Sequence, residues 1–298
     1  MERYRLRSLK RDKDIVLTLL FYLVPGLVLM LLFQLWPILR ALYYSFLKVN
    51  LMSGKKESVG LKNYIDAFSD RIFLRSIWTT FKYFLMRVPL QIVLGFLLAL
   101  LVVKKTKFSG FMRTVILIPV ITSMVVVTAV FGLMFHPSNG LINGILSWFG
   151  IPAQGFLTDE RQALWSIAYM TIWKNVGRTM LFFLAGLMGI PESLYEAVSI
   201  DGANTIQKHV YVTIPMLGPT FAFVFLTTTI NSFQVFGPVL MTTGGGPANS
   251  TNVIVMHIYQ NAFVYNQVGY ASALSIIFAS MLIVVSLIQN VLKRRLEK

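Results

Sequence analysis

Long apolar stretches separated by short polar segments dominate this chain. A membrane-spanning helix needs about 20 mostly apolar residues, and the first such stretch, Ile15–Leu39, contains no charged residue. Between Lys208 and Lys293 there is no Asp, Glu, Lys or Arg, a stretch far longer than one span needs, and the turn-forming segment 242–247 divides it. The pattern therefore predicts six spans, at about 15–47, 78–103, 114–135, 163–189, 215–241 and 269–292.

Composition and charge agree with a membrane protein. Hydrophobic residues make up 56% of the chain and charged residues 13%, too few charges to cover the surface of a water-soluble enzyme. The net charge of +15 would suggest nucleic acid in a soluble protein. Here the basic residues gather in 1–14, 104–113 and 293–298, each next to an apolar run, which is typical of cytoplasmic loops. This pattern predicts a multi-pass protein of the plasma or inner membrane with both termini in the cytoplasm.

The same pattern predicts the domain organisation. One segment is an exception to the rule that basic residues gather in cytoplasmic loops. Residues 48–75 carry six Lys and Arg residues, yet this segment must lie outside because it follows the first span from a cytoplasmic N-terminus. The predicted parts are a basic cytoplasmic N-terminus (1–14), a first transmembrane helix (15–47), an outer loop (48–75), a transmembrane domain (76–292) and a basic cytoplasmic tail (293–298).

The polar loop at 191–215 carries the most information. Pro191 suits the first turn of a short helix, and Glu192 is favourable near the positive end of that helix. Gly202 then ends the helix, and the residues after it can begin a second one at an angle. We predict a helix–turn–helix on the cytoplasmic face, with an ordinary interfacial helix as the alternative.

The loop contains Glu196-Ala197-Val198, then Gly202, nine residues, and Val212-Thr213-Ile214-Pro215. This pattern resembles the EAA loop of type I ABC importer permeases. The departures at Val198, Val212 and Ile214 are all aliphatic. The flanks resemble the sugar-permease branch that includes the first maltose-transporter permease and the glycerol-3-phosphate permease subunit. Further matches lie at 59–64, 118–119, 139–143, 232–236, 243–247 and 269–275.

The resemblance implies an all-α fold of six transmembrane helices with a cytoplasmic coupling helix that sits in a cleft of a separate ATPase subunit. Glu196 would make the charged contact and Gly202 would permit the turn. It also implies a heterodimer with a second homologous permease, two ATPase subunits, an external solute-binding protein and a surrounding of membrane lipid. The coupling residues predicted on this basis are Glu196, Ala197, Asp201, Gly202, Ala203 and Pro215.

Nothing in the sequence indicates an enzyme. No P-loop pattern occurs, so ATP and its Mg²⁺ are expected on the partner ATPases rather than on this chain. The chain has no cysteine, its three histidines lack ligand spacing, and no catalytic carboxylate pair is present. We therefore predict no catalytic residue and no metal site here.

Polar residues inside two spans are candidates for the substrate path. Lys174 and Arg178 lie one helical turn apart beside Trp173, and intramembrane charge is by default a functional-site hypothesis. The alternative is a wet interface in which the two charges meet carboxylates or backbone carbonyls. Asn231, Phe233 and Gln234 suit the hydroxyls and apolar face of a sugar, the alternative being hydrogen bonds between helices.

We therefore predict a permease subunit of a binding-protein-dependent ABC importer that moves a neutral di- or oligosaccharide by ATP-driven alternating access. Within this class the alternative is a glycerol-3-phosphate-type permease, which would need cations in its cavity. From another class the alternative is a secondary transporter, which the lack of Asp and Glu in the six spans disfavours.

Overall fold

The structure is a computed structural model that describes residues 18–49, 54–104 and 106–296, so the basic leader at 1–14 lies outside the described residues. The described residues belong to two compact units. The N-terminal unit holds the residues up to Ala67 together with Asn261–Ile277, and the core unit holds Phe68–Gln260 together with the residues from Phe278 on.

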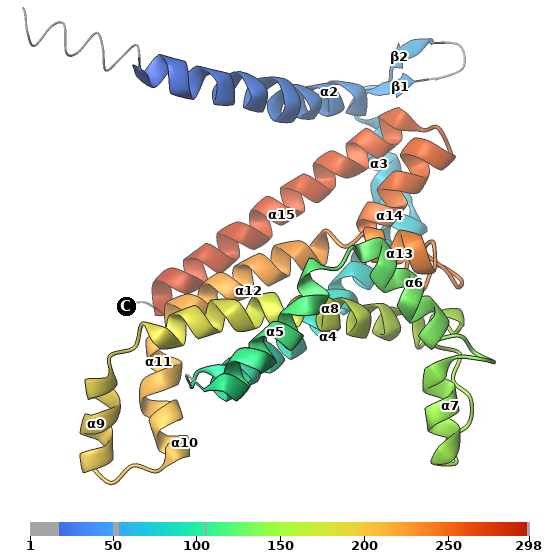
Figure 1. Cartoon of the computed structure of the whole chain (residues 1–298). Coiled ribbons are helices and arrows are strands. Elements are labelled where there is room, and N and C mark those ends of the chain that lie inside the picture. The colour runs from blue at the N-terminus through green and yellow to red at the C-terminus, as the bar shows by residue number, and fades with distance from the viewer. Residues whose placement is uncertain (1–17, 50–53, 105, 297–298) are drawn as a thin grey trace, which may run out of the picture. The chain divides into compact units, whose positions relative to one another are not determined.

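Helices form most of both units (Figure 1). The first helical run is Thr18–Ser45, which includes a π-helical turn at Leu31–Leu35 and ends as α2 (Trp36–Ser45). The other elements are β1 (Leu47–Val49), β2 (Lys56–Ser58), α3 (Lys62–Ser69), α4 (Arg71–Val102), α5 (Lys107–Ile121), α6 (Met124–Met134), α7 (Leu141–Trp148), α8 (Ala163–Met188), α9 (Glu192–Ile200), α10 (Thr205–Lys208), α11 (Ile214–Met216), α12 (Gly218–Phe233), α13 (Gly237–Thr242), α14 (Ile254–Tyr259) and α15 (Val268–Leu296).

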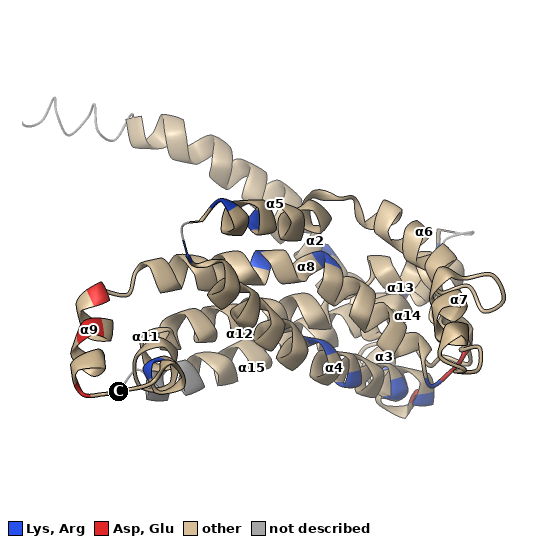
Figure 2. Ribbon diagram, turned by 60° about the horizontal axis from the view of Figure 1, so that its bottom comes forward, with Lys and Arg blue, Asp and Glu red and all other residues tan. Residues whose placement is uncertain are grey.

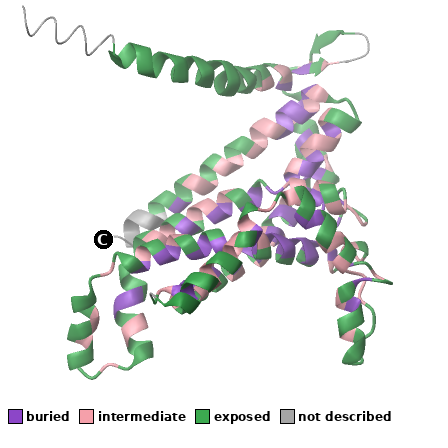
Figure 3. Ribbon diagram, viewed as in Figure 1, coloured by how far each residue is buried: buried purple, intermediate pink, exposed green. Residues whose placement is uncertain are grey.

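The N-terminal unit is built on the long helix Thr18–Ser45. Its hydrophobic residues are exposed along nearly the whole helix (Figure 3), as expected for a surface that faces lipid or a neighbouring subunit. β1 and β2 follow as an antiparallel hairpin, with Lys48 opposite Glu57. The side-chain amide of Asn63 donates to the carbonyl of Ser45 at 2.8 Å and to that of Leu47 at 3.1 Å, which ties α3 to the end of the helix.

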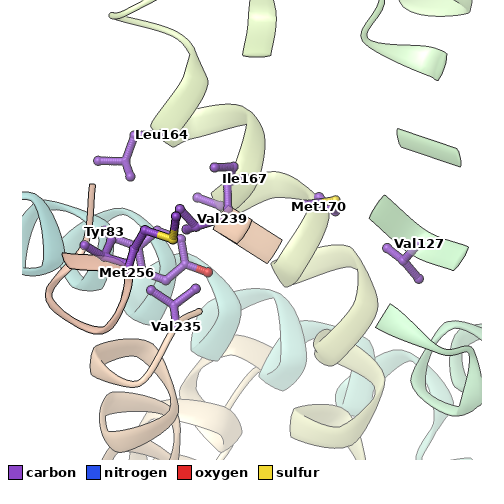
Figure 4. Packing of buried hydrophobic residues seen from close by; sticks show 10 residues of the cluster. Tyr83, Val127, Leu164, Ile167, Met170, Val235, Val239 and Met256 are labelled. Atoms are coloured by element: carbon purple, nitrogen blue, oxygen red, sulfur yellow. The ribbon is translucent and has the colours of Figure 1, made fainter. Parts of the chain in front are cut away.

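The core unit is organised around α4 and α8, which pack side by side (Figure 1). A Cβ at Gly95 would overlap the side chain of Thr179, so the glycine permits the close approach of the two helices. Tyr83 of α4 is fully buried and its hydroxyl lies 2.7 Å from the hydroxyl of Thr171. Around it packs a cluster of apolar side chains that includes Ile167 and Met170 of α8 (Figure 4).

The six predicted spans are confirmed, three as single helices and three as bent helix pairs. Three helices are long and apolar enough to cross a membrane, and six spans result when each bent helix pair counts as one. The third predicted span, 114–135, consists of α5 and α6 bent by 97°, because Thr122 and Ser123 adopt extended backbone angles. The fifth, 215–241, begins with a bend of 67° between Thr205–Met216 and α12. It ends as α12 at Phe233, and the short helix α13 follows, with Pro238 in its first turn.

The predicted outer loop at 48–75 also contains regular structure. It holds the hairpin, α3 and the start of α4, which begins at Arg71 rather than near Trp78. Asp70 caps α4, since its carboxylate accepts from the backbone N–H of Ile72 at 2.7 Å and of Phe73 at 3.2 Å. A polar, charged sequence therefore extends the span as a helix beyond its apolar part.

Asp70 also faces His257, which lies in α14 outside the candidate spans. His257 Nε2 is 3.3 Å from the Asp70 carboxylate, and the imidazole stacks on Phe73. Burial lowers the pKa of His257 below its ordinary value of 6.5, although the Asp70 carboxylate opposes that shift. Because the folded pKa is depressed, the unfolded chain binds the proton more readily, and stability present above pH 6.5 is lost as pH falls below it.

We therefore expect the melting temperature of the purified protein to decrease between about pH 7.5 and about pH 5.5. His257→Gln should flatten part of that decrease, because the variant side chain does not titrate. An equal pH dependence in the variant would show that His257 does not contribute.

Candidate functional site

A cavity of about 460 Å³ opens between helices of the core unit, a size within the usual range for small-ligand sites. It is lined by α4, α8 and α12, with additional residues at the start of α6 and in the segment after α12. Its long polar side chains are Arg87, Gln91, Asn175, Arg178, Asn231 and Gln234.

Two of these polar residues come from α4, one turn apart on one helix face. Arg87 Nε donates to Gln91 Oε1 at 3.0 Å, and Arg87 Nη1 lies 3.4 Å from the backbone carbonyl of Asn231. Gln91 Nε2 donates in turn to Thr179 Oγ1 of α8 at 2.9 Å. The network joins three helices through neutral acceptors, although the Arg87 side chain is buried and charged.

α8 supplies a second cation to the same cavity. Arg178 Nη2 donates to Asn175 Oδ1 at 2.6 Å, and Asn175 Nδ2 donates to the carbonyl of Thr171 at 2.8 Å. Arg178 is exposed, whereas Arg87 is 6% exposed. Figure 2 shows basic segments and no acidic ones along α8. The cavity therefore has two guanidinium groups and no carboxylate among its lining residues.

The structure brings half of the six predicted path residues to the cavity. Arg178, Asn231 and Gln234 line it. Phe233 instead points into the protein, 6% exposed, with its ring centroid 5.5 Å from that of Phe84. Trp173 packs edge-on against Phe131 at 5.3 Å and lies outside the lining.

Lys174 also lies outside the cavity lining and holds the break between α5 and α6. Its ammonium donates to the carbonyls of Thr122 at 2.8 Å, Val120 at 3.2 Å and Pro119 at 3.4 Å. These carbonyls belong to the end of α5, where a cation is favourable and acceptors have no helical partner. Lys174 thus has the contacts that the sequence alternative described, namely backbone carbonyls.

The substrate path predicted from the sequence did not include Arg87 and Gln91. In the sequence Arg87 is a charge that interrupts the second span, and only its spacing of four residues from Gln91 indicates that the two side chains share a helix face. Nothing in one sequence tells whether such a pair faces lipid, a neighbouring helix or a cavity. The packing of α4 against α8 decides it.

The second candidate site is the helix–turn–helix that follows α8. α9 bends away from α8 by 70°, and most of α9 is exposed (Figure 3). Glu196, Ala197 and Asp201 are among the exposed residues. Gly202 has a φ of +80°, a backbone conformation that residues with a Cβ rarely adopt. The backbone N–H of Gly202 donates to Ser199 and that of Ala203 to Val198, which is a Schellman motif at the end of α9.

Hydrogen bonds also fix α10, the helix that follows the turn. Asn204 and Gln207 form a reciprocal capping box at the start of α10. Tyr195 of α9 lies 2.9 Å, hydroxyl to hydroxyl, from Thr213 in the segment that leads to the exposed Pro215 in α11. The two arms therefore form one preorganised projection with exposed apolar tips, Ile200 at 87% and Ile206 at 74% exposure.

Comparisons with known proteins identify the family of the chain. The family model for the "Binding-protein-dependent transport system inner membrane component" matches residues 91–298. The lactose transport system permease protein LacF of Rhizobium radiobacter is 34% identical over 288 residues, covering 95% of this chain and 95% of LacF. The sn-glycerol-3-phosphate transport system permease protein UgpA of Agrobacterium fabrum is 33% identical over 264 residues, covering 88% and 89%.

A solved structure has the same fold over the whole chain. It belongs to a bacterial ABC transporter involved in the import of the acidic polysaccharide alginate, with 25% identity and a TM-score of 0.86 over 99% of this chain and 100% of the other. Because these relatives are permease subunits, the secondary-transporter alternative is set aside. The chain therefore belongs to the family of binding-protein-dependent transport system inner membrane components, and it is an integral membrane permease of the sugar and polyol ABC importers, not itself an enzyme.

Proposed function

We propose that this chain is one half of the translocation path of a carbohydrate importer, with the core-unit cavity as the place where the cargo passes. A second homologous permease would supply the other half, and an external solute-binding protein would deliver the cargo. The polar, uncharged loop 242–252 is the surface that we assign to that delivery. Both termini and residues 191–215 are assigned to the cytoplasm, and 137–160 to the outside.

The observation that carries the proposal is the projection formed by α9 and α10. Its turn is held by the left-handed Gly202, and its tip exposes Ile200 and Ile206, which are costly to leave in water unless another protein covers them. The charged side chain of Glu196 lies exposed on the same projection. These features support docking to an ATPase subunit, which would bind ATP and Mg²⁺ and drive alternating access through this contact.

The cavity supports passage of a carbohydrate, with two candidate cargo types. Asn231 and Gln234 offer amide groups to sugar hydroxyls, which supports the neutral di- or oligosaccharide predicted from the sequence. Arg87 and Arg178 support the alternative cargo, an acidic polyol such as glycerol 3-phosphate, because that cargo needs cations in the cavity.

Single cysteines test the proposal, because the native chain has none. Ser193→Cys in α9 and Ser138→Cys before α7 are near-isosteric changes at exposed positions. In intact cells an impermeant thiol reagent should label Ser138→Cys only. In inverted vesicles it should label Ser193→Cys, and bound ATPase should protect that position. Labelling of Ser193→Cys from outside, or no protection by the ATPase, would contradict the proposed coupling.

A further inference from the structure

We infer that the core-unit cavity selects an anionic carbohydrate, one that carries a carboxylate, phosphate or sulfonate group. The inference rests on the proposed function of the cavity as the translocation path. It differs from the neutral cargo expected from the sequence, since that expectation did not include Arg87 in the path. The cavity lining instead combines two guanidinium groups with amides and contains no acidic residue.

The charges of the lining have no counter-charge in the part of the chain that the structure describes. The single ion pair there joins His257 to Asp70, away from this cavity. Arg87 is held by neutral groups, the amide oxygen of Gln91, the backbone carbonyl of Asn231 and the ring of Tyr83, whose centroid lies 5.9 Å from Arg87 Cζ. Arg178 is likewise held by the amide oxygen of Asn175. A buried guanidinium without a counter-ion is unfavourable, and an entering anion would relieve that cost.

The chemistry of arginine narrows the class of ligand to sugars that carry an oxyanion. A guanidinium presents a planar fork of donors that matches the paired oxygens of a carboxylate, phosphate or sulfonate. A neutral sugar could use the amides of Asn231 and Gln234 but would leave two like charges facing one cavity. An oxyanion on a sugar satisfies both sets of groups, the oxyanion at the arginines and the hydroxyls at the amides.

The sources of the anion can be distinguished by three labelled probes that differ in one group: glucose, glucuronic acid and glucose 6-phosphate. We would measure their equilibrium binding to the purified importer, with both permeases and the ATPases present and the solute-binding protein left out. Without that protein, its own selectivity does not enter the measurement. One or both acidic probes should bind about tenfold or more tightly than glucose.

Arg178→Gln is the decisive variant, because Arg178 is exposed and its removal leaves the buried network of Arg87 intact. It should weaken binding of the acidic probe about tenfold or more, and Arg178→Lys should fall between, since it keeps the charge and loses the fork. Lys174→Gln is the matched control, a cation one turn away that contacts carbonyls of α5 instead of the cavity. It should lower thermal stability and leave the binding preference unchanged.

The inference would be overturned by equal binding of glucose and the acidic probes, by failure of both acidic probes to bind, or by unchanged acidic binding in Arg178→Gln. If the arginines instead pair with a carboxylate of the second permease, Arg178→Gln should reduce recovery of the permease pair while acidic probes bind no better than glucose. Labelling and ATPase protection of Ser193→Cys are independent of these outcomes. If Ser193→Cys is labelled and protected as expected but the binding experiment fails, the proposed function stands. Only the inference about the charge of the cargo is then overturned.

Discussion

Gly202→Val should weaken coupling to the ATPase strongly while the chain still inserts and folds in the membrane. Gly202 has a φ of +80°, and a β-branched residue forced into that region costs about 1–3 kcal/mol. Because the Schellman motif at 198–203 depends on that conformation, the projection of α9 and α10 would lose its preorganised angle. We expect ATPase recovery in pull-downs and solute uptake to fall about tenfold or more, since each 1.4 kcal/mol is about a factor of ten.

Steric overlap of the added Cβ cannot explain such an effect, because a Cβ at Gly202 meets no atom within 4 Å. Gly144→Val provides the matched control, since Gly144 in α7 is equally open but has an ordinary helical φ. It should leave ATPase recovery unchanged. Parental uptake by Gly202→Val, with normal ATPase recovery, would show that this turn does not couple the two subunits.

Gly269→Ala should destabilise the N-terminal unit strongly, for the opposite physical reason. Gly269 lies in the first turn of α15 with an ordinary backbone, but a Cβ there would overlap the carbonyl oxygen of Leu47. A backbone atom cannot move aside as a side chain can, so the start of α15 would have to shift away from the first helix and hairpin. Overpacking of this kind costs about 1–3 kcal/mol. We expect a lower melting temperature and faster proteolysis in the hairpin at 47–58.

Gly132→Ala is the control for that substitution. Gly132 lies inside α6 with no atom within 4 Å of an added Cβ, so alanine should stabilise the helix by about 1 kcal/mol or less. The same chemical change should thus give opposite signs at the two positions. Equal melting temperatures for Gly269→Ala and the parent would show that the contact with Leu47 is not maintained in the assembled protein.

Patterns local in the chain were predictable without the structure. Apolar runs of span length located the six spans, because lipid requires about 20 apolar residues in a helix. The spacing from Glu196 to Gly202 and Pro215 located the helix–turn–helix, and the structure has a left-handed glycine at the predicted turn. The predicted coupling roles and domain boundaries stay predictions.

Tertiary packing decided which polar side chains meet. Lys174 and Arg178 are equivalent in the sequence, one turn apart on α8, yet the break after Ile121 brings α5 carbonyls to Lys174 and leaves Arg178 at the cavity. Phe233 and Gln234 are neighbours, but the end of α12 separates them into core and cavity lining. Composition and spacing along one helix therefore determined where the membrane segments are. The long-range contacts of α4, α8 and α12 determined the charge of the site, because no periodicity within one helix specifies which neighbour it will face.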